Sequence, residues 1–220
     1  MEESSSGVYA PQILEFVTVA DQFCKHVERT SGYKPSEFLS IMQRLLPFLY
    51  VKAVNLPPTE PNFEEGNERF VREEDWTLIE RTIASRLGLM NSFEEPFDQA
   101  LHGSGEPSAG EVSEYIADIY QDLKDFLLQY RTGTEEVMND AVWECSMHFE
   151  TVWGRKLLGT VRAIHNIIYS GTDIDSQATG HGAQGAEHRD QGSGRRAQGS
   201  ETDTSSWFIS KRQEEYGEDD

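Results

Sequence analysis

The sequence has no long hydrophobic run and little cysteine. Its longest apolar stretch, Leu45 to Val51 (LLPFLYV), is far shorter than the ~20 residues that cross a bilayer, so we expect no membrane partner. The first seven residues are acidic and polar and do not resemble a secretion signal. Cys24 and Cys145 lie in apolar helical patterns and fit neither a disulfide framework nor a zinc site. These features predict a cytoplasmic protein with two buried free thiols.

Positive charge is also scarce. The 220 residues include 39 acidic and 19 basic side chains, which gives a formal net charge of −20. No Lys or Arg lies between Arg86 and Lys124, although carboxylates are frequent there. A field of this sign repels phosphate backbones. We therefore expect no nucleic-acid partner, and a protein partner with a basic surface.

Apolar residues recur at helical spacing along most of the chain, which predicts an all-α protein. The predicted helices cover about residues 9–30, 35–54, 73–87, 111–130 and 134–169. Residues 91–101 are a candidate short helix, followed by a linker at 102–110, and no stretch alternates as a strand would. Gly154 and Gly159 are expected to bend the last helix. The predicted fold is an up-and-down-like bundle of five helices, or six if residues 91–101 are helical.

The second predicted helix is unusually apolar. Around Leu45, Leu46, Phe48 and Leu49 it is hydrophobic on nearly every side, which predicts a central place in the bundle. Pro47 is expected to kink it.

The composition changes abruptly at Ser170. Residues 170–206 are rich in Gly, Ser, Gln, Thr and Asp, and such a stretch cannot bury enough apolar surface to offset its ordering entropy. We therefore divide the chain into a flexible N-terminus (1–7), a bundle domain (8–169), a disordered low-complexity linker (170–206) and an aromatic, acidic terminal peptide (207–220). Trp207, Phe208 and Tyr216 in that peptide are candidate docking residues, for a partner or for the bundle itself.

Carboxylates form a stripe along each of the last two helices. The stripes contain Glu114, Asp118, Asp122 and Asp125 on one helix, and Glu136, Asp140, Glu144 and His148 on the other. Carboxylates from adjacent helices can converge on Mg²⁺ or Mn²⁺, which makes Glu114, Asp118, Asp122, Asp140 and Glu144 the candidate metal ligands.

The competing interpretation is that each stripe is the solvated face of an amphipathic helix. Helical geometry favours it, because the carboxylates of helix 111–130 centre about 140° from the middle of its apolar face. We therefore expect no resident cofactor, with a divalent metal as the alternative.

Two stretches, Ile116 to Phe126 (IADIYQDLKDF) and Glu135 to Leu158 (EEVMNDAVWECSMHFETVWGRKLL), carry a resemblance to a known family. Together with the LLPFLY motif they resemble the helical bacterial family with domain of unknown function 5063, found mainly in Bacteroidetes. The resemblance covers about residues 8–169. It implies an all-helical, cytoplasmic protein, and it implies no activity because the family has none assigned.

The nearest enzyme class is the all-helical nucleotide pyrophosphohydrolases, which bind magnesium through a Glu-x-x-Glu and a Glu-x-x-Asp pair on neighbouring helices. Glu111 and Glu114 match the first pair, but the last helix has Glu136 followed by Asn139. A Glu-x-x-Asp at residues 95–98 precedes the first pair and contains a proline. No Ser or Cys has an identifiable base in the pattern, so we assign no catalytic residue.

Two side chains on the last helix are candidates for partner binding. Trp143 and Met147 lie nearer its polar side than its apolar face and are predicted to line a partner groove. His26, His148 and His165 lack neighbours at metal-ligand spacing, so we expect solvated or hydrogen-bonded histidines.

Our leading hypothesis is a non-enzymatic protein–protein interaction or regulatory module with an acidic surface, to which the terminal peptide adds a tethered contact. One alternative is a Mg²⁺- or Mn²⁺-dependent phosphohydrolase of all-helical type that uses Asp118, Asp122 and Asp140. Another is a structural homo-oligomer in which the exposed part of helix 134–169 pairs with its copy.

Overall fold

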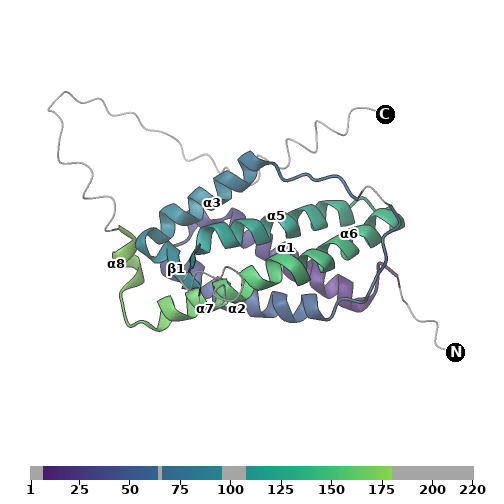
Figure 1. The fold of residues 1–220 in the computed structure, drawn as a ribbon. Coiled ribbons are helices and arrows are strands. Elements are labelled where there is room, and N and C mark those ends of the chain that lie inside the picture. Colours follow the sequence, from purple (N-terminus) through teal and green to yellow (C-terminus); the bar gives the residue numbers. More distant parts are fainter. Residues whose placement is uncertain (1–6, 64–65, 96–107, 180–220) are drawn as a thin grey trace, which may run out of the picture. The chain divides into compact units, whose positions relative to one another are not determined.

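The predicted all-α class is confirmed in a computed structural model that describes residues 7–63, 66–95 and 108–179. All of these residues belong to one compact unit, which extends from Met1 to His181. Its helices pack lengthwise against one another, and a two-stranded sheet lies at one end (Figure 1). No helix in the described part is long and apolar enough to cross a bilayer.

The first two helices form a hairpin. α1 (Pro11–Glu28) and α2 (Pro35–Val54) each begin with a proline at the first turn, where its missing N–H costs no hydrogen bond. The short 3₁₀ helix η1 (Thr30–Gly32) joins them. Lys52 near the end of α2 forms an ion pair of 2.7 Å with Glu15 near the start of α1, so the two helices are antiparallel.

α3 (Glu73–Leu87) packs antiparallel on α5 (Val112–Tyr130), which is the central helix and also contacts α1, α6 and α7. Between α3 and α5 the chain forms a 3₁₀ turn, η2 (Gly88–Asn91), and strands β1 (Ser92–Glu95) and β2 (Ser108–Glu111).

The strands correct the prediction of a short helix followed by a linker. β1 pairs antiparallel with β2, and Phe93 lies opposite Gly110 in the register. The ring of Phe93 packs edge-on against Tyr115 of α5, with 5.5 Å between the ring centroids. Residues 92–95 are therefore extended because Phe93 contacts the bundle, and the local sequence pattern does not reveal such a contact.

The last predicted helix is one continuous element with a π-helical interruption. α6 (Glu135–His148) leads into a π segment (Phe149–Trp153) and then into α7 (Gly154–Tyr169). A Cβ atom at Gly154 would lie 2.4 Å from the carbonyl oxygen of Phe149, so this backbone approach requires glycine. The interruption turns the indole of Trp153 into the core, where its N–H donates to the carbonyl of Cys145 at 3.1 Å.

The core lies where α1, α5 and the π segment meet. Phe16 packs against Phe126 at 5.2 Å and against Trp153 at 6.4 Å between ring centroids, and all three side chains are buried. Cys24 and Cys145 are buried free thiols, as predicted.

The described fold continues ten residues beyond the predicted boundary at residue 169. A short helix, α8 (Ile174–Thr179), packs against α2, α3 and η2. Asp175 accepts hydrogen bonds from the backbone N–H of Ser36 at 3.0 Å and from its hydroxyl at 2.9 Å, at the start of α2. Trp207, Phe208 and Tyr216 lie outside the described residues.

The prediction that α2 is central is wrong. α2 packs against α1 and α7, with α8 at its start, while α5 takes the central position. Leu46 and Leu49 are buried, but Phe48 and Val51 on the outer side are 51% and 52% exposed. Apolar residues on every side of a helix therefore do not show that every side is buried.

Candidate functional site between α5 and α6

The two carboxylate stripes lie on neighbouring antiparallel helices, and residues 55–63 and 66–72 pass over them on the way from α2 to α3. We call these two described stretches together the crossing segment. Asp125 of α5 is buried and accepts hydrogen bonds from the backbone N–H groups of Phe70 and Val71, both at 2.8 Å. Burial raises the pKa of Asp125, and these two hydrogen bonds offset part of that rise.

Asp140 of α6 holds an earlier part of the crossing segment. It is buried and accepts the backbone N–H groups of Asn62 at 2.7 Å and Phe63 at 2.8 Å. The side-chain amides of Asn62 and Asn139 donate to the same carboxylate at 2.8 and 3.1 Å. Burial favours the protonated acid, but these hydrogen bonds outweigh it and lower the pKa of Asp140.

Glu144, one turn further along α6, accepts the backbone N–H of Asn67 at 2.8 Å. The preceding residue, Gly66, has a positive φ of 73°, and a Cβ atom there would lie 2.9 Å from the Glu144 carboxylate. Gln129 of α5 donates to the carbonyl of Glu68 at 3.0 Å. The crossing segment is thus fixed to both helices through its backbone.

Two further carboxylates of the α5 stripe, Asp118 and Asp122, join α5 to other helices. Asp118 accepts the indole N–H of Trp76 on α3 at 2.8 Å and forms an ion pair with Lys156 on α7. Asp122 hydrogen-bonds to Nδ1 of His148 on α6 at 2.9 Å. This hydrogen bond raises the pKa of His148, against the opposing effect of burial.

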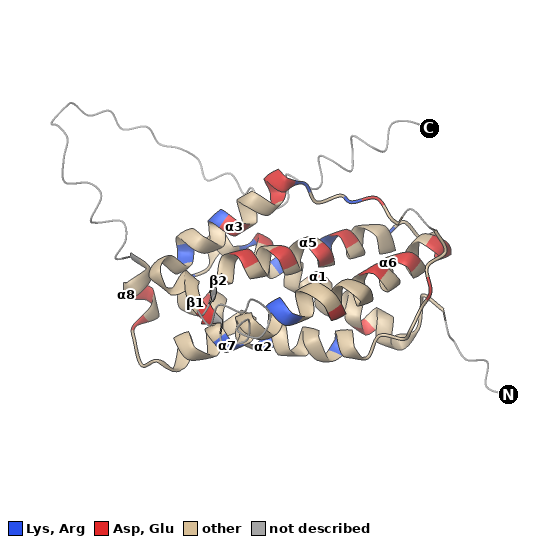
Figure 2. Cartoon of the chain, in the orientation of Figure 1, with Lys and Arg blue, Asp and Glu red and all other residues tan. Residues whose placement is uncertain are grey.

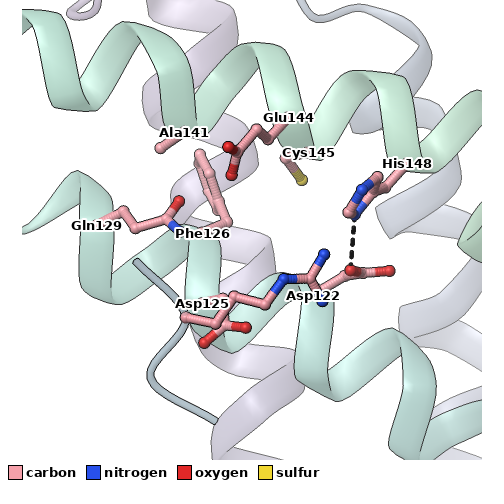
Figure 3. A pocket seen from close by; sticks show the side chains of 9 residues that line it. Asp122, Asp125, Phe126, Gln129, Ala141, Glu144, Cys145 and His148 are labelled. Atoms are coloured by element: carbon pink, nitrogen blue, oxygen red, sulfur yellow. Dashed lines mark hydrogen bonds and ion pairs between the residues drawn. The ribbon is translucent and has the colours of Figure 1, made fainter. Parts of the chain in front are cut away.

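A small polar pocket remains between the anchored groups. Figure 3 shows Asp122, Asp125 and Gln129 of α5 facing Ala141, Glu144, Cys145 and His148 of α6, and Arg69 and Phe126 complete the lining. The open space is about 20 Å³, enough for a water molecule. Pockets that hold drug-sized or larger ligands measure about 300–1,000 Å³.

The expectation that both stripes are solvated is wrong for most of their members. Asp125 and Asp140 are buried, Asp118, Asp122 and Glu144 are half-buried, and only Glu114 and Glu136 are exposed. Among the described residues, no three His, Cys, Asp or Glu side chains are placed together as metal ligands would be. Four of the five candidate ligands, Asp118, Asp122, Asp140 and Glu144, are instead hydrogen-bonded to separate partners, and Glu114 is exposed.

The predicted partner-binding residues lie on the outer side of α6. Trp143 and Met147 are half-buried, while Glu136 and Glu150 are exposed. The four residues follow one another at steps of seven, four and three, so they share one face of the helical element. We call this set the α6 stripe.

Charge is unevenly distributed among the helices. α6 contains four carboxylate residues and neither Lys nor Arg, whereas α7 contains Arg155, Lys156 and Arg162 and no carboxylate. Figure 2 shows acidic residues along α5 and α6 and at the start of α3. Lys124, the basic residue of α5, is buried and pairs with Glu28 of α1 at 2.8 Å, so it does not offset the exposed negative charge.

The two thiols are not placed for chemistry. Burial raises the pKa of Cys24 and of Cys145 above the usual value, which keeps both in the unreactive thiol form. Two of the three histidines considered above are hydrogen-bonded, His26 to the hydroxyl of Tyr33 at 2.8 Å and His148 to Asp122.

Sequence reasoning found the carboxylates but missed their role as anchors for the crossing segment. Loops longer than about 15 residues are uncommon, and their backbone donors need acceptors wherever they pack against the protein. The sequence did contain a signal for this role. Residues 55–72 form a long connection, and the two carboxylate stripes had no assigned partners that could serve as acceptors.

Comparisons with known proteins are consistent with the described fold. The family described as Domain of unknown function (DUF5063) matches residues 8–170. A similar solved structure is the crystal structure of protein BF1032 from Bacteroides fragilis, with 35% sequence identity and a TM-score of 0.67. That match covers 75% of this chain and 97% of the other. No curated protein matches this chain.

Proposed function

The chain belongs to the family of the domain of unknown function DUF5063, and we propose that it is a protein-binding module whose α6 stripe takes a basic, amphipathic segment of a partner protein. The observation that carries the proposal is the composition of the stripe. Trp143 and Met147 provide apolar contact area, and Glu136 and Glu150 lie exposed on either side of them. Tryptophan and methionine are enriched in protein interfaces, and a methionine side chain adapts readily to different partners.

The surroundings of the stripe favour a basic partner. Exposed Glu135 lies beside Glu136, and the amide of Asn139 donates to the backbone carbonyl of Glu60 at 2.7 Å, which brings the exposed residue Glu60 next to α6. Because α6 has no Lys or Arg, this surface attracts positive charge. Complementary charge of this kind increases the association rate and excludes acidic competitors.

The crossing segment supports the proposal by making α6 rigid. Asp140 and Glu144 fix α6 to the crossing segment, and His148 fixes it to α5. A helix fixed in this way presents its exposed residues in one orientation, which reduces the entropy cost of binding.

The phosphohydrolase alternative has less support. Asp118 and Asp140, two of its three proposed ligands, already accept hydrogen bonds from Trp76 and from the crossing segment. The pocket beside Asp122 has room for a water molecule and not for a nucleotide.

The proposal is tested by capture from cell extract with matched charge-reversal variants of the full chain. Glu136→Lys with Glu150→Lys reverses the ends of the α6 stripe, and Glu37→Lys with Glu114→Lys makes the same net change at exposed positions elsewhere. We expect the stripe variant to retain at least about tenfold less partner protein, because each reversal replaces an attraction by a repulsion. The control variant should retain as much as the parent chain.

Capture should also weaken between 50 and 300 mM salt, because exposed charges are screened. Equal capture by both variants, or capture that does not depend on salt, would contradict the proposal. So would the absence of any specifically retained protein.

A further inference from the structure

The outer side of α2 carries exposed hydrophobic residues, and the ammonium group of Lys52 lies over one of them, 5.3 Å from the ring centroid of Phe48. Phe48, Val51 and Val54 are 51%, 52% and 58% exposed, and Pro47 is exposed beside them. Their spacing places them on one face over two turns, and we call them the apolar stripe.

Charge on this side differs from that of the whole protein. α2 contains Glu37, Arg44 and Lys52, whereas the chain as a whole has a net charge of −20. α2 packs against α1 and α7, while the acidic helix α6 and helix α3 pack against α5. Figure 1 shows α3 and α2 on opposite sides of α5. At the apolar stripe, two copies of this acidic protein therefore meet less repulsion than they would at α6.

The exposed apolar area is large enough to form the centre of a dimer contact. The exposed parts of the stripe amount to on the order of 300 Å² per copy, which is the size of the largest apolar patch on many monomeric proteins, and such patches are often functional. Two copies face to face would bury about 600 Å² from these residues, a little over a third of a standard interface. Flanking half-buried residues of α2, among them Ile41 and Leu45, adjoin it and can supply further area.

We propose that the apolar stripe of α2 binds the same surface of a second copy to form a symmetric homodimer. In such a contact Phe48 of each copy packs between the valines of the other, and each stripe is removed from water. The acidic α6 stripes remain free, so the dimer would offer two of them to partners. This inference does not depend on the proposed function of the α6 stripe.

Sedimentation equilibrium on the full chain between 1 and 100 µM tests the dimer. Phe48→Glu places a carboxylate in the centre of the contact, and we expect it to weaken dimerisation at least about 30-fold, as loss of a central aromatic anchor does. Leu78→Glu is the matched control, because Leu78 is a 50% exposed leucine on α3, away from the apolar stripe. It should dimerise like the parent chain.

Salt distinguishes this contact from pairing between unlike surfaces. Raising NaCl from 0.1 to 0.5 M should strengthen the proposed dimer, because it screens repulsion between the acidic copies and leaves the apolar contact intact. A parent chain that is monomeric up to 100 µM would overturn the proposal. A dimer that Phe48→Glu leaves intact would also overturn it. So would a dimer that dissociates at high salt and is abolished by Glu136→Lys, because such a dimer would join α2 to an acidic surface.

Discussion

Two regions of the molecule reverse the usual relation between polarity and burial. At the interface of α5 and α6 with the crossing segment, polar side chains are buried. On the outer side of α2, apolar side chains are exposed. Between α5 and α6, Asp125 and Asp140 are buried beneath a loop. On α2, Phe48 and Val51 are exposed. The polar residues are buried because backbone N–H groups of the crossing segment need acceptors. The apolar residues are exposed because the helices that pack on α2 cover only its inner side.

This comparison predicts that substitutions in the first region lower the stability of the fold, and that substitutions in the second region weaken association. A buried carboxylate that accepts two N–H groups cannot be removed without leaving both groups unsatisfied. An exposed hydrophobic residue can be removed at little cost to the folded monomer, and its cost appears only on association.

The largest effect is expected from Asp125→Ala. The substitution leaves the N–H groups of Phe70 and Val71 without their acceptor, so we expect the free energy of unfolding to fall by about 3 kcal/mol. Urea denaturation measures this change. Glu114→Ala, an exposed carboxylate on the same helix, should change it by less than about 0.5 kcal/mol. Similar losses in both variants would remove the distinction between buried anchors and solvated carboxylates.

A smaller loss is expected from Gly66→Ala. An alanine at a φ of 73° is strained, and its Cβ atom would crowd the Glu144 carboxylate, so unfolding should become easier by about 1–2 kcal/mol. Gly32→Ala is the control, because nothing lies within 4 Å of its Cβ position and its φ is not positive. If Gly66→Ala were as well tolerated as Gly32→Ala, the crossing segment would not be held at this position.

His148 predicts a pH dependence of stability. Its pKa is raised above 6.5 by the hydrogen bond with Asp122, so the stabilisation is fully present below pH 6.5 and is lost as the pH rises through the folded-state value. His148→Gln should therefore destabilise the protein more at pH 6 than at pH 8.5, by up to about 1 kcal/mol. Urea denaturation at the two pH values measures the difference, and an equal loss at both would contradict the charged pair.

The smallest effect is expected on the outer side of α2. Phe48→Ala should lower the unfolding free energy of the monomer by less than about 1 kcal/mol, because half of the side chain is already in water. Leu49→Ala, at the adjacent buried position, should cost about 2–4 kcal/mol. Thermal unfolding at 1 µM, where the monomer is favoured, compares the two, and equal costs would show that Phe48 is part of the core.

Helical periodicity predicted all five main helices, because an amphipathic pattern reports packing within one element. It did not predict the small sheet, where contact between Phe93 and Tyr115 stabilises a short extended segment. Periodicity also predicted that the bundle ends at residue 169. The hydrogen bond from Ser36 to Asp175, which attaches α8 to the start of α2, cannot be recognised from the composition of this stretch.

The candidate site was only partly predictable for the same reason. The spacing of Asp118, Asp122 and Asp140 showed correctly that the carboxylates share helix faces. What faces them is the backbone of residues 62–71 and side chains from other helices, and backbone donors have no sequence signature. The surroundings of α2 were misjudged because hydrophobicity does not reveal how many helices pack on it.

Hydrogen exchange of individual backbone amides, followed by NMR, tests most directly whether the buried carboxylates anchor the crossing segment. The amides of Asn62, Phe63, Asn67, Phe70 and Val71 should exchange slowly in the parent chain, because each donates to a carboxylate of α5 or α6. Asp125→Ala should remove protection at Phe70 and Val71 first. Exchange at the rate of an unstructured loop at all five positions in the parent chain would contradict the account.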